Sequence, residues 1–117
     1  MKEENRKTGR FGEDLAADFL KKKGYEIVER NFATRFGEID IIARKNGVTV
    51  FVEVKTKKGD EFGSPEEMVG KNKLGRVKRM ATVYLDGKEV TCRIDMVAVV
   101  LDGQNKVQRI THYENLT

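Results

Sequence analysis

Two runs of β-branched residues joined by Asn46-Gly47 constrain the fold of this chain most strongly. The stretch GEIDIIARKNGVTVFVEVKTK covers residues 37–57, and its two runs are typical of paired strands. Asn46-Gly47 favours a two-residue type I′ turn because both residues tolerate a positive φ. The sequence therefore predicts a β-hairpin over 37–44 and 48–56, in which Lys45 pairs with Val48.

This register predicts that acidic residues oppose each other on one face of the hairpin. Asp40 faces Glu53, and Glu38 faces Lys55. We assign this face to chemistry and the other face to the core, with Ile39, Ile41, Ala43, Val50, Val52 and Val54. Directly opposed like charges are destabilising, so the pair needs a compensating cation. Lys55 offers one charge, but a divalent metal is the better solution because Mg²⁺ and Mn²⁺ prefer hard carboxylate oxygens.

Apolar residues at helical spacing predict a first helix over 9–23. Thr8 is its candidate N-cap, and Gly24 lies just beyond its C-terminus. Its expected buried face consists of Phe11, Leu15, Ala16, Phe19 and Leu20. Glu13 falls at the edge of this apolar arc, so we expect it to border the core.

A second helix is predicted within residues 64–87, with Ser64 as N-cap, Pro65 at the first helical position and Glu67 closing a capping box. Gly70 and Gly75 weaken its first turns, which predicts a late start or a kink. Its inward stripe is Leu74, Val77, Ala81, Tyr84 and Leu85, and Gly87 ends it. Its flanks carry Lys71, Lys73, Arg76, Lys78 and Arg79, which are candidates for nucleic-acid contact or for a solvated face.

Three further strands complete the prediction. They cover 25–34, 89–101 as a central strand and 106–114 as an edge strand. The resulting order is an αβββαβ core with a mixed sheet flanked by helices, in the α/β class. The length of 117 residues suits a single domain over 1–117 with one core.

Composition narrows the functional classes. The net charge of +4 and the pI near 9.2 favour an anionic partner. Cys92 is the only cysteine and His112 the only histidine, so neither an intramolecular disulfide nor a zinc site made from these two is expected. The charged N-terminus and the lack of a long apolar run predict no signal peptide, no membrane span and a cytoplasmic location.

Asp40 followed by Glu53-Val54-Lys55 resembles the PD-(D/E)xK motif of restriction-endonuclease-like nucleases. Glu13 resembles the helical glutamate that archaeal Holliday junction resolvases place in the same site. More closely, five segments within residues 8–101 resemble the YraN-like family of small predicted bacterial endonucleases: GRFGEDLAADFLKKKGYEIVERNF, GEIDIIA, FVEVKTK, FGSPEEMV and RIDMVAV. No proline precedes Asp40, where this chain has Ile39.

The resemblance implies a restriction-endonuclease-like fold and a metal-dependent nuclease acting on structured or branched DNA. It implies that Asp40, Glu53 and the Val54 carbonyl bind Mg²⁺ or Mn²⁺, with Glu13 binding a second metal or orienting water. Lys55 would orient the attacking water or stabilise charge on the phosphate. Lys71, Lys73, Arg76 and Lys78 are the expected nucleic-acid contacts. A homodimer is expected by analogy.

Other interpretations of the same residues remain open at this stage. The face carrying Asp40, Glu53 and Lys55 is also compatible with an exposed salt-bridge ladder, and Glu13 with a solvated helical residue. We expect Asp95 to pair with Arg93 or to cap a buried network rather than to bind metal. The aromatic residues Tyr25, Phe32, Phe36 and Phe62 suit either base stacking or core packing. A catalytically silent nucleic-acid-binding module and a partner-dependent subunit are the alternative functions.

Overall fold

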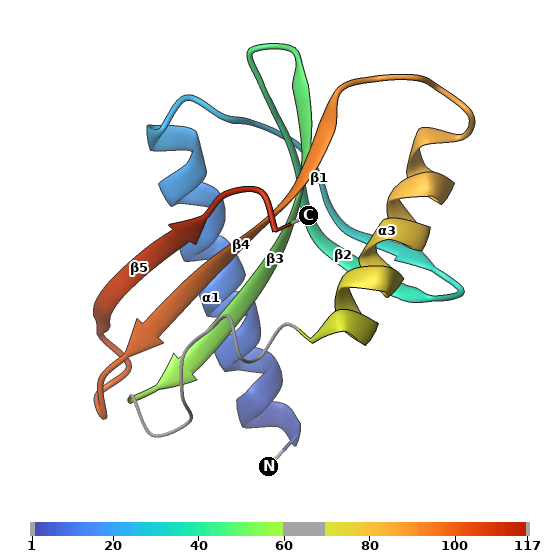
Figure 1. Ribbon diagram of the computed structural model, residues 1–117. Coiled ribbons are helices and arrows are strands. Elements are labelled where there is room, and N and C mark those ends of the chain that lie inside the picture. The colour runs from blue at the N-terminus through green and yellow to red at the C-terminus, as the bar shows by residue number, and fades with distance from the viewer. Residues whose placement is uncertain (1, 60–69, 117) are drawn as a thin grey trace.

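The chain folds as two helices packed on a five-stranded sheet, in a computed structural model that describes residues 2–59 and 70–116 (Figure 1). The described elements are α1 (Lys2–Lys22), β1 (Glu26–Thr34), β2 (Gly37–Lys45), β3 (Val48–Lys58), α3 (Lys71–Leu85), β4 (Cys92–Leu101) and β5 (Val107–Tyr113). This confirms a mixed α/β fold with the predicted element order. No helix in the described part of the chain is long and apolar enough to cross a membrane.

The sheet has the strand order β1-β2-β3-β4-β5. Neighbouring strands are antiparallel except β3 and β4, which run parallel. Parallel strands need a crossover connection, and α3 lies in that crossover. The prediction that the strand after the second helix is interior is confirmed, since β4 lies between β3 and β5 and is buried along nearly its whole length.

The hairpin between β2 and β3 has the predicted register. Pairing runs from Lys45 opposite Val48 to Ile41 opposite Val52. Asn46 and Gly47 adopt φ values of 52° and 78°, as a type I′ turn requires. The local turn therefore determines which residues of β2 and β3 meet.

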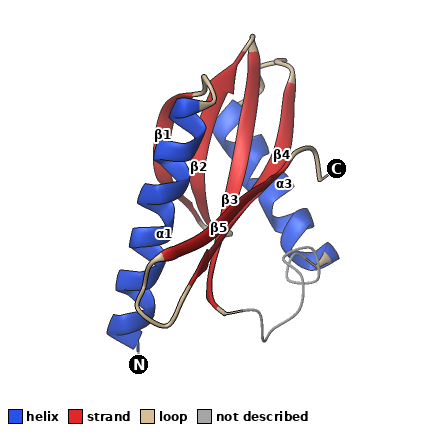
Figure 2. Ribbon diagram, turned by 90° about the vertical axis from the view of Figure 1, so that its left-hand side faces the viewer, coloured by secondary structure: helices blue, strands red, loops and turns tan. Residues whose placement is uncertain are grey.

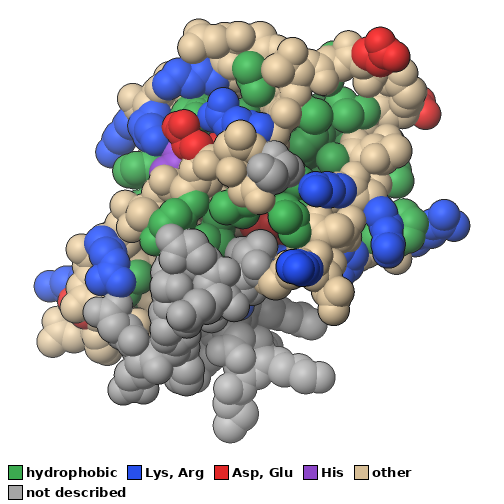
Figure 3. All heavy atoms as spheres, in the orientation of Figure 1, with side chains coloured by type: hydrophobic (Ala, Val, Ile, Leu, Met, Phe, Trp, Pro, Cys, Tyr) green, Lys and Arg blue, Asp and Glu red, His purple; other side chains and the backbone are tan. Residues whose placement is uncertain are grey.

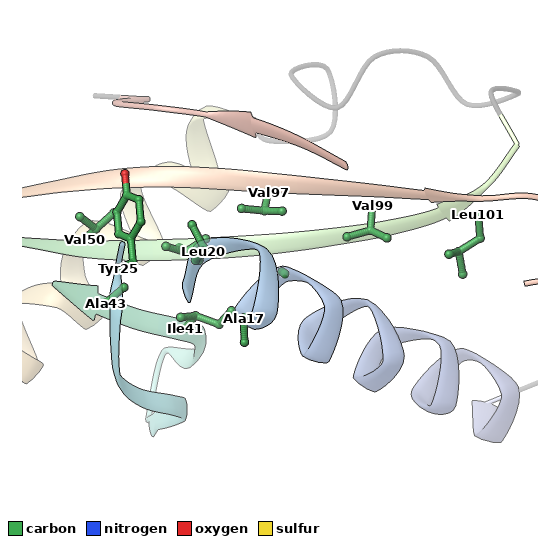
Figure 4. Packing of buried hydrophobic residues seen from close by; sticks show 11 residues of the cluster. Ala17, Leu20, Tyr25, Ile41, Ala43, Val50, Val97, Val99 and Leu101 are labelled. Atoms are coloured by element: carbon green, nitrogen blue, oxygen red, sulfur yellow. The ribbon is translucent and has the colours of Figure 1, made fainter. Parts of the chain in front are cut away.

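Both faces of the sheet are buried, as Figure 2 shows with the sheet lying between α1 and α3. On the α1 side, Ala17 and Leu20 point toward aliphatic residues of the sheet, among them Val97 and Val99 (Figure 4). On the α3 side, Val77, Met80 and Ala81 pack against Ile39, Ile42, Phe51 and Ile94. The expectation that one face is core and the other only carries chemistry is therefore wrong, because α3 in the crossover builds a second core layer on that face. Ile39, expected in the first layer, packs in the second.

Helix α1 begins earlier than predicted, at Lys2, so Thr8 lies inside the helix and is not its N-cap. Ala16 and Leu20 are fully buried as expected, whereas Phe11 is 41% exposed. Gly24 has a φ of 91° and follows the helix C-terminus. A side chain at Gly12 would overlap the Thr56 hydroxyl, so α1 crosses β3 at a distance that only glycine permits.

Helix α3 begins after Gly70, consistent with the predicted late start. The proposed capping residues Ser64, Pro65 and Glu67 lie outside the described residues. The inward stripe is confirmed, since all its members pack in the α3-side layer: Leu74, Val77, Ala81, Tyr84 and Leu85. Asp86 and Gly87 follow with φ values of 49° and 80° and end the helix.

Candidate functional site

The acidic pair lies where β2 and β3 stop pairing. The last regular pair is Ile41 with Val52, and Asp40 and Glu53 come next on the two strands. Here the Val54 N–H donates a hydrogen bond to Asp40 Oδ2 over 2.8 Å. The Asp40 carboxylate thus takes the place of a backbone acceptor on the neighbouring strand, which holds it beside Glu53.

Glu53 is only 4% exposed, and its pKa is raised to about 9. Burial is the largest cause, followed by the hydrogen bond with Asp40 and by the negative charge of Asp40, while Lys73 acts in the opposite direction. At neutral pH the pair therefore carries a proton, with protonated Glu53 donating to Asp40. A proton on Glu53 relieves the repulsion between the opposed acids in the metal-free fold, and the expectation that a metal ion compensates the pair stays a prediction.

Glu13 approaches the same acids from α1. The close crossing of Gly12 over Thr56 brings this turn of the helix onto β3. The pKa of Glu13 is raised by burial and then by the charge of Asp40, whereas Arg30 and Asn31 lower it. Its Oε1 atom is buried without a hydrogen-bond partner and lies 3.9 Å from the Arg30 guanidinium. The side chain is 17% exposed, so Glu13 borders the core and is not a solvated surface residue.

Asp40 and Glu53 line a hollow of about 180 Å³ between the sheet and α3. We call it the acid hollow; its lining is Phe36, Gly37, Glu38, Asp40, Glu53, Lys73, Arg76, Val77 and Met80. Lys73 and Arg76 therefore join the acids, although the sequence argument assigned them only to an exposed helix flank. Their helical spacing was the available signal, because Lys73 precedes the buried Val77 by four residues and Arg76 precedes Met80 by four.

Lys55 lies in a different hollow from the acidic pair. It lines the α1 side of β3 together with Glu13, Val54 and Thr56. The structure thus brings Lys55 to Glu13, while Asp40 and Glu53 open toward α3. Within the described residues Lys55 forms no ion pair with Glu38, so the predicted salt-bridge ladder is not seen.

The carboxylates provide a partial set of metal ligands. Residues 2–59 and 70–116 contain no group of three or more His, Cys, Asp or Glu side chains arranged to hold a metal ion. Two hard oxygen donors, Asp40 and Glu53, do lie side by side and share a proton that a cation could replace. This donor set fits Mg²⁺, which is commonly held by one or two carboxylates together with water and substrate phosphate.

A second hollow runs along the exposed side of α3. We call it the α3 groove; its lining is Phe36, Lys71, Asn72, Gly75, Arg76 and Arg79. Phe36 and Arg76 line both this groove and the acid hollow, so the two are adjacent. Figure 3 shows Lys and Arg side chains on the side of the molecule where α3 lies and also on the opposite side. Lys78, another expected nucleic-acid contact, lines neither hollow.

Asp95 is held by a separate set of groups. It accepts hydrogen bonds from Arg93 Nε at 3.0 Å and from the Asn115 N–H at 2.9 Å, and its Oδ2 lies 2.7 Å from His112 Nε2. The predicted pairing of Asp95 with Arg93 is confirmed. Cys92 is an exposed free thiol.

Comparison with known proteins places this chain in a family. The model of the Uncharacterised protein family UPF0102 matches residues 12–99, which include Glu13, Asp40, Glu53 and Lys55. A UPF0102 protein of Syntrophomonas wolfei is 46% identical over 91% of this chain and 96% of its own length. For a UPF0102 protein of Corynebacterium efficiens the identity is 43%, over 99% of this chain and 96% of the relative. As the YraN-like resemblance predicted, the chain belongs to the UPF0102 family.

Proposed function

We propose that this protein is a metal-dependent nuclease that hydrolyses phosphodiester bonds through Asp40 and Glu53, with a restriction-endonuclease-like arrangement of its αβββαβ core. The observation that carries the proposal is the buried, proton-sharing pair of Asp40 and Glu53 beside Lys73 and Arg76. A buried acid with a strongly raised pKa, set in a hollow with cations, is typical of a functional site. A purely structural acid pair has no need of two cations at its mouth.

In this proposal Asp40 and Glu53 hold Mg²⁺ or Mn²⁺ after Glu53 loses the shared proton. The ion, when bound, polarises a phosphate oxygen and activates water. Arg76 and Lys73 hold the phosphate at the acid hollow, because their charges oppose those of the phosphate oxygens. The water oxygen bonds to phosphorus and gives up a proton to solvent, the bond from phosphorus to the leaving sugar oxygen breaks, and that oxygen takes up a proton from solvent.

Lys55 and Glu13 act from the α1 side of β3. Because they line one hollow next to Val54, we propose that Glu13 orients water and that Lys55 stabilises charge that develops on the phosphate. Glu13 Oε1 makes a long ion pair of 3.9 Å with Arg30 and no hydrogen bond, so it keeps hydrogen-bonding capacity for this role. A second candidate is a binding module without catalysis, which the lack of a three-ligand group among the described residues favours.

The test is cleavage of branched, flapped, nicked and linear DNAs and of a structured RNA with Mg²⁺ or Mn²⁺. We expect Asp40→Asn to abolish cleavage, and Lys55→Ala to lower kcat at least ~10²-fold with little change in KM, because only interactions stronger in the transition state accelerate the reaction. Lys58→Ala is the matched control, since Lys58 is exposed on the same strand. A wild-type protein that binds these substrates but cleaves none would support the binding module instead.

A further inference from the structure

Phe36 connects the acid hollow to the α3 groove. It lies between β1 and β2 and, with Arg76, lines both hollows. We infer that Phe36 is a stacking platform for an unpaired base next to the phosphate held at the acid hollow, so that the substrate strand is single-stranded at this point. This inference rests on the proposed nuclease function, because it names the form of nucleic acid that the same site takes.

The position of Phe36 is determined locally. Its N–H donates a hydrogen bond to Thr34 Oγ1 over 3.0 Å, and Thr34 Oγ1 donates to the Gly37 carbonyl, also over 3.0 Å. Gly37 has a φ of 127°, which a side chain would disfavour, so this tight turn suits glycine. The ring is half-buried against the α3-side layer, and the Arg35 guanidinium lies over the ring, 4.9 Å from its centroid. Phe36 is thus a fixed aromatic surface, and a base that stacks there either displaces the exposed Arg35 side chain or stacks on its guanidinium plane.

The charges around Phe36 suit a nucleic-acid backbone. The α3 groove is lined by Lys71, Arg76 and Arg79, and none of the lining residues within the described part of the chain is acidic. The acid hollow next to it contains Asp40 and Glu53. A strand whose phosphates follow the groove therefore reaches the acids at Arg76, where its adjacent base lies beside Phe36.

This geometry favours a single strand over a duplex. In a duplex each base is stacked between its neighbours and paired at its edge, so an aromatic ring at the level of the backbone cannot reach a base face. In a single strand the faces are accessible, and proteins that bind such strands combine a basic groove with aromatic platforms. Removing one such platform weakens binding roughly 5- to 100-fold.

The other aromatic candidates from the sequence do not occupy such a position. Tyr25 is buried in the α1-side layer and is only 4% exposed. Phe32 packs edge-on against Tyr84, with ring centroids 5.2 Å apart. Phe62 lies outside the described residues. Of the aromatic residues that the structure describes, Phe36 alone lines both hollows.

The experiment measures binding of labelled oligonucleotides of one sequence in EDTA: single-stranded DNA, single-stranded RNA and blunt duplex DNA. We expect the full-length wild-type protein to bind a single strand at least ~10-fold more tightly than the duplex. Phe36→Leu keeps an apolar side chain for the core and should weaken single-strand binding roughly 5- to 100-fold while leaving duplex binding unchanged. Phe36→Tyr, which keeps the aromatic ring, should bind the single strand as tightly as the wild type. Comparison of the single-stranded DNA with the single-stranded RNA shows whether the site prefers deoxyribose or ribose.

Two controls separate the contribution of Phe36 from general effects. Phe11→Leu removes an aromatic ring that is 41% exposed on α1, and Lys21→Ala removes an exposed cation of α1. Neither residue lines either hollow, so neither change should alter the preference for a single strand. Equal binding of duplex and single strand by the wild type, or unchanged binding by a folded Phe36→Leu variant, overturns the inference. If either of these results were found and the protein still cleaved duplex DNA, the inference about Phe36 would fail but the nuclease proposal would stand. If binding depended on Phe36 but no substrate were cleaved, the nuclease proposal would fail and the inference that Phe36 stacks on a base would stand.

Discussion

The fold shifts the pKa values of two buried acids on neighbouring strands in opposite directions. Asp95 on β4 is fully buried and Glu53 on β3 is 4% exposed. The pKa of Asp95 is lowered: burial raises it, but hydrogen bonds from His112, Arg93 and the Asn115 N–H outweigh that effect. The pKa of Glu53 is raised to about 9, because its burial is accompanied by a second acid, Asp40. One acid is stabilised as an anion, and the other keeps its proton.

The difference in pKa between the two acids indicates which of them can bind a cation. Donors from within the fold surround Asp95, so an added cation would have to displace Arg93 or His112. Glu53 and Asp40 share a proton and face an open hollow. A metal ion can replace this proton without breaking any interaction that the core depends on. The contrast between the two regions can be tested in three ways, in order of decreasing effect.

The largest difference should appear in the stability of neutralised variants. We expect Asp95→Asn to lower the free energy of unfolding by about 3 kcal/mol at pH 7, because it leaves Arg93 without its buried partner. Glu53→Gln should instead be neutral or stabilising, since it removes the cost of keeping Glu53 protonated in the fold at a pH where the unfolded group is ionised. Urea unfolding of the metal-free proteins measures both. Equal losses in the two variants would contradict the contrast.

The pH dependence of stability should also differ between the two acids. Folded Glu53 keeps its proton up to a pKa of about 9 while the unfolded group ionises near 4.5, so its contribution falls as the pH rises between these values. The slope is at most about 1.4 kcal/mol per pH unit. Asp95, with a lowered pKa, contributes stability above 3.8 that is lost on further acidification.

Urea unfolding of the metal-free protein from pH 5 to pH 9 checks this expectation. Glu53→Gln should flatten the decrease in the free energy of unfolding between pH 5 and pH 9, whereas Asp95→Asn should leave this decrease unchanged. Glu13 contributes a smaller slope of the same sign, because its pKa is also raised. A wild-type protein whose stability is constant over this range would argue against a protonated Glu53.

Metal uptake should release the shared proton. We expect the apparent affinity for Mn²⁺ to rise up to about tenfold per pH unit between pH 6 and pH 8, because the cation displaces a proton from Glu53. Calorimetry in buffers of different ionisation enthalpy counts the protons released. Lys73→Ala should shift this dependence to higher pH, since Lys73 lowers the pKa of Glu53, and Lys78→Ala is its control. Uptake that is independent of pH would count against binding at this pair.

Local signals in the sequence predicted the hairpin but not the environment of its acids. Asn46-Gly47 determines the register through its own backbone, so the neighbouring positions of Asp40 and Glu53 could be derived. The proton on Glu53 could not be derived from the sequence, because its pKa depends on burial and on the charge of Lys73 in α3, about twenty residues further along the chain. The early start of α1 was missed since its first turns are charged and lack apolar periodicity, although Lys, Glu and Arg are good helix formers.

The crossover between β3 and β4 divides the residues of the candidate site between two segments of the chain. The acids Asp40 and Glu53 belong to one hairpin, whereas Lys73 and Arg76 come from α3. The inward stripe of α3 secures the helix to the sheet, and its remaining positions form the rim of the hollow. Substitutions on that rim can therefore change which molecules enter while the acids stay in place. Under the proposed function, the residues for substrate selection and those for chemistry are encoded in separate segments of this short chain.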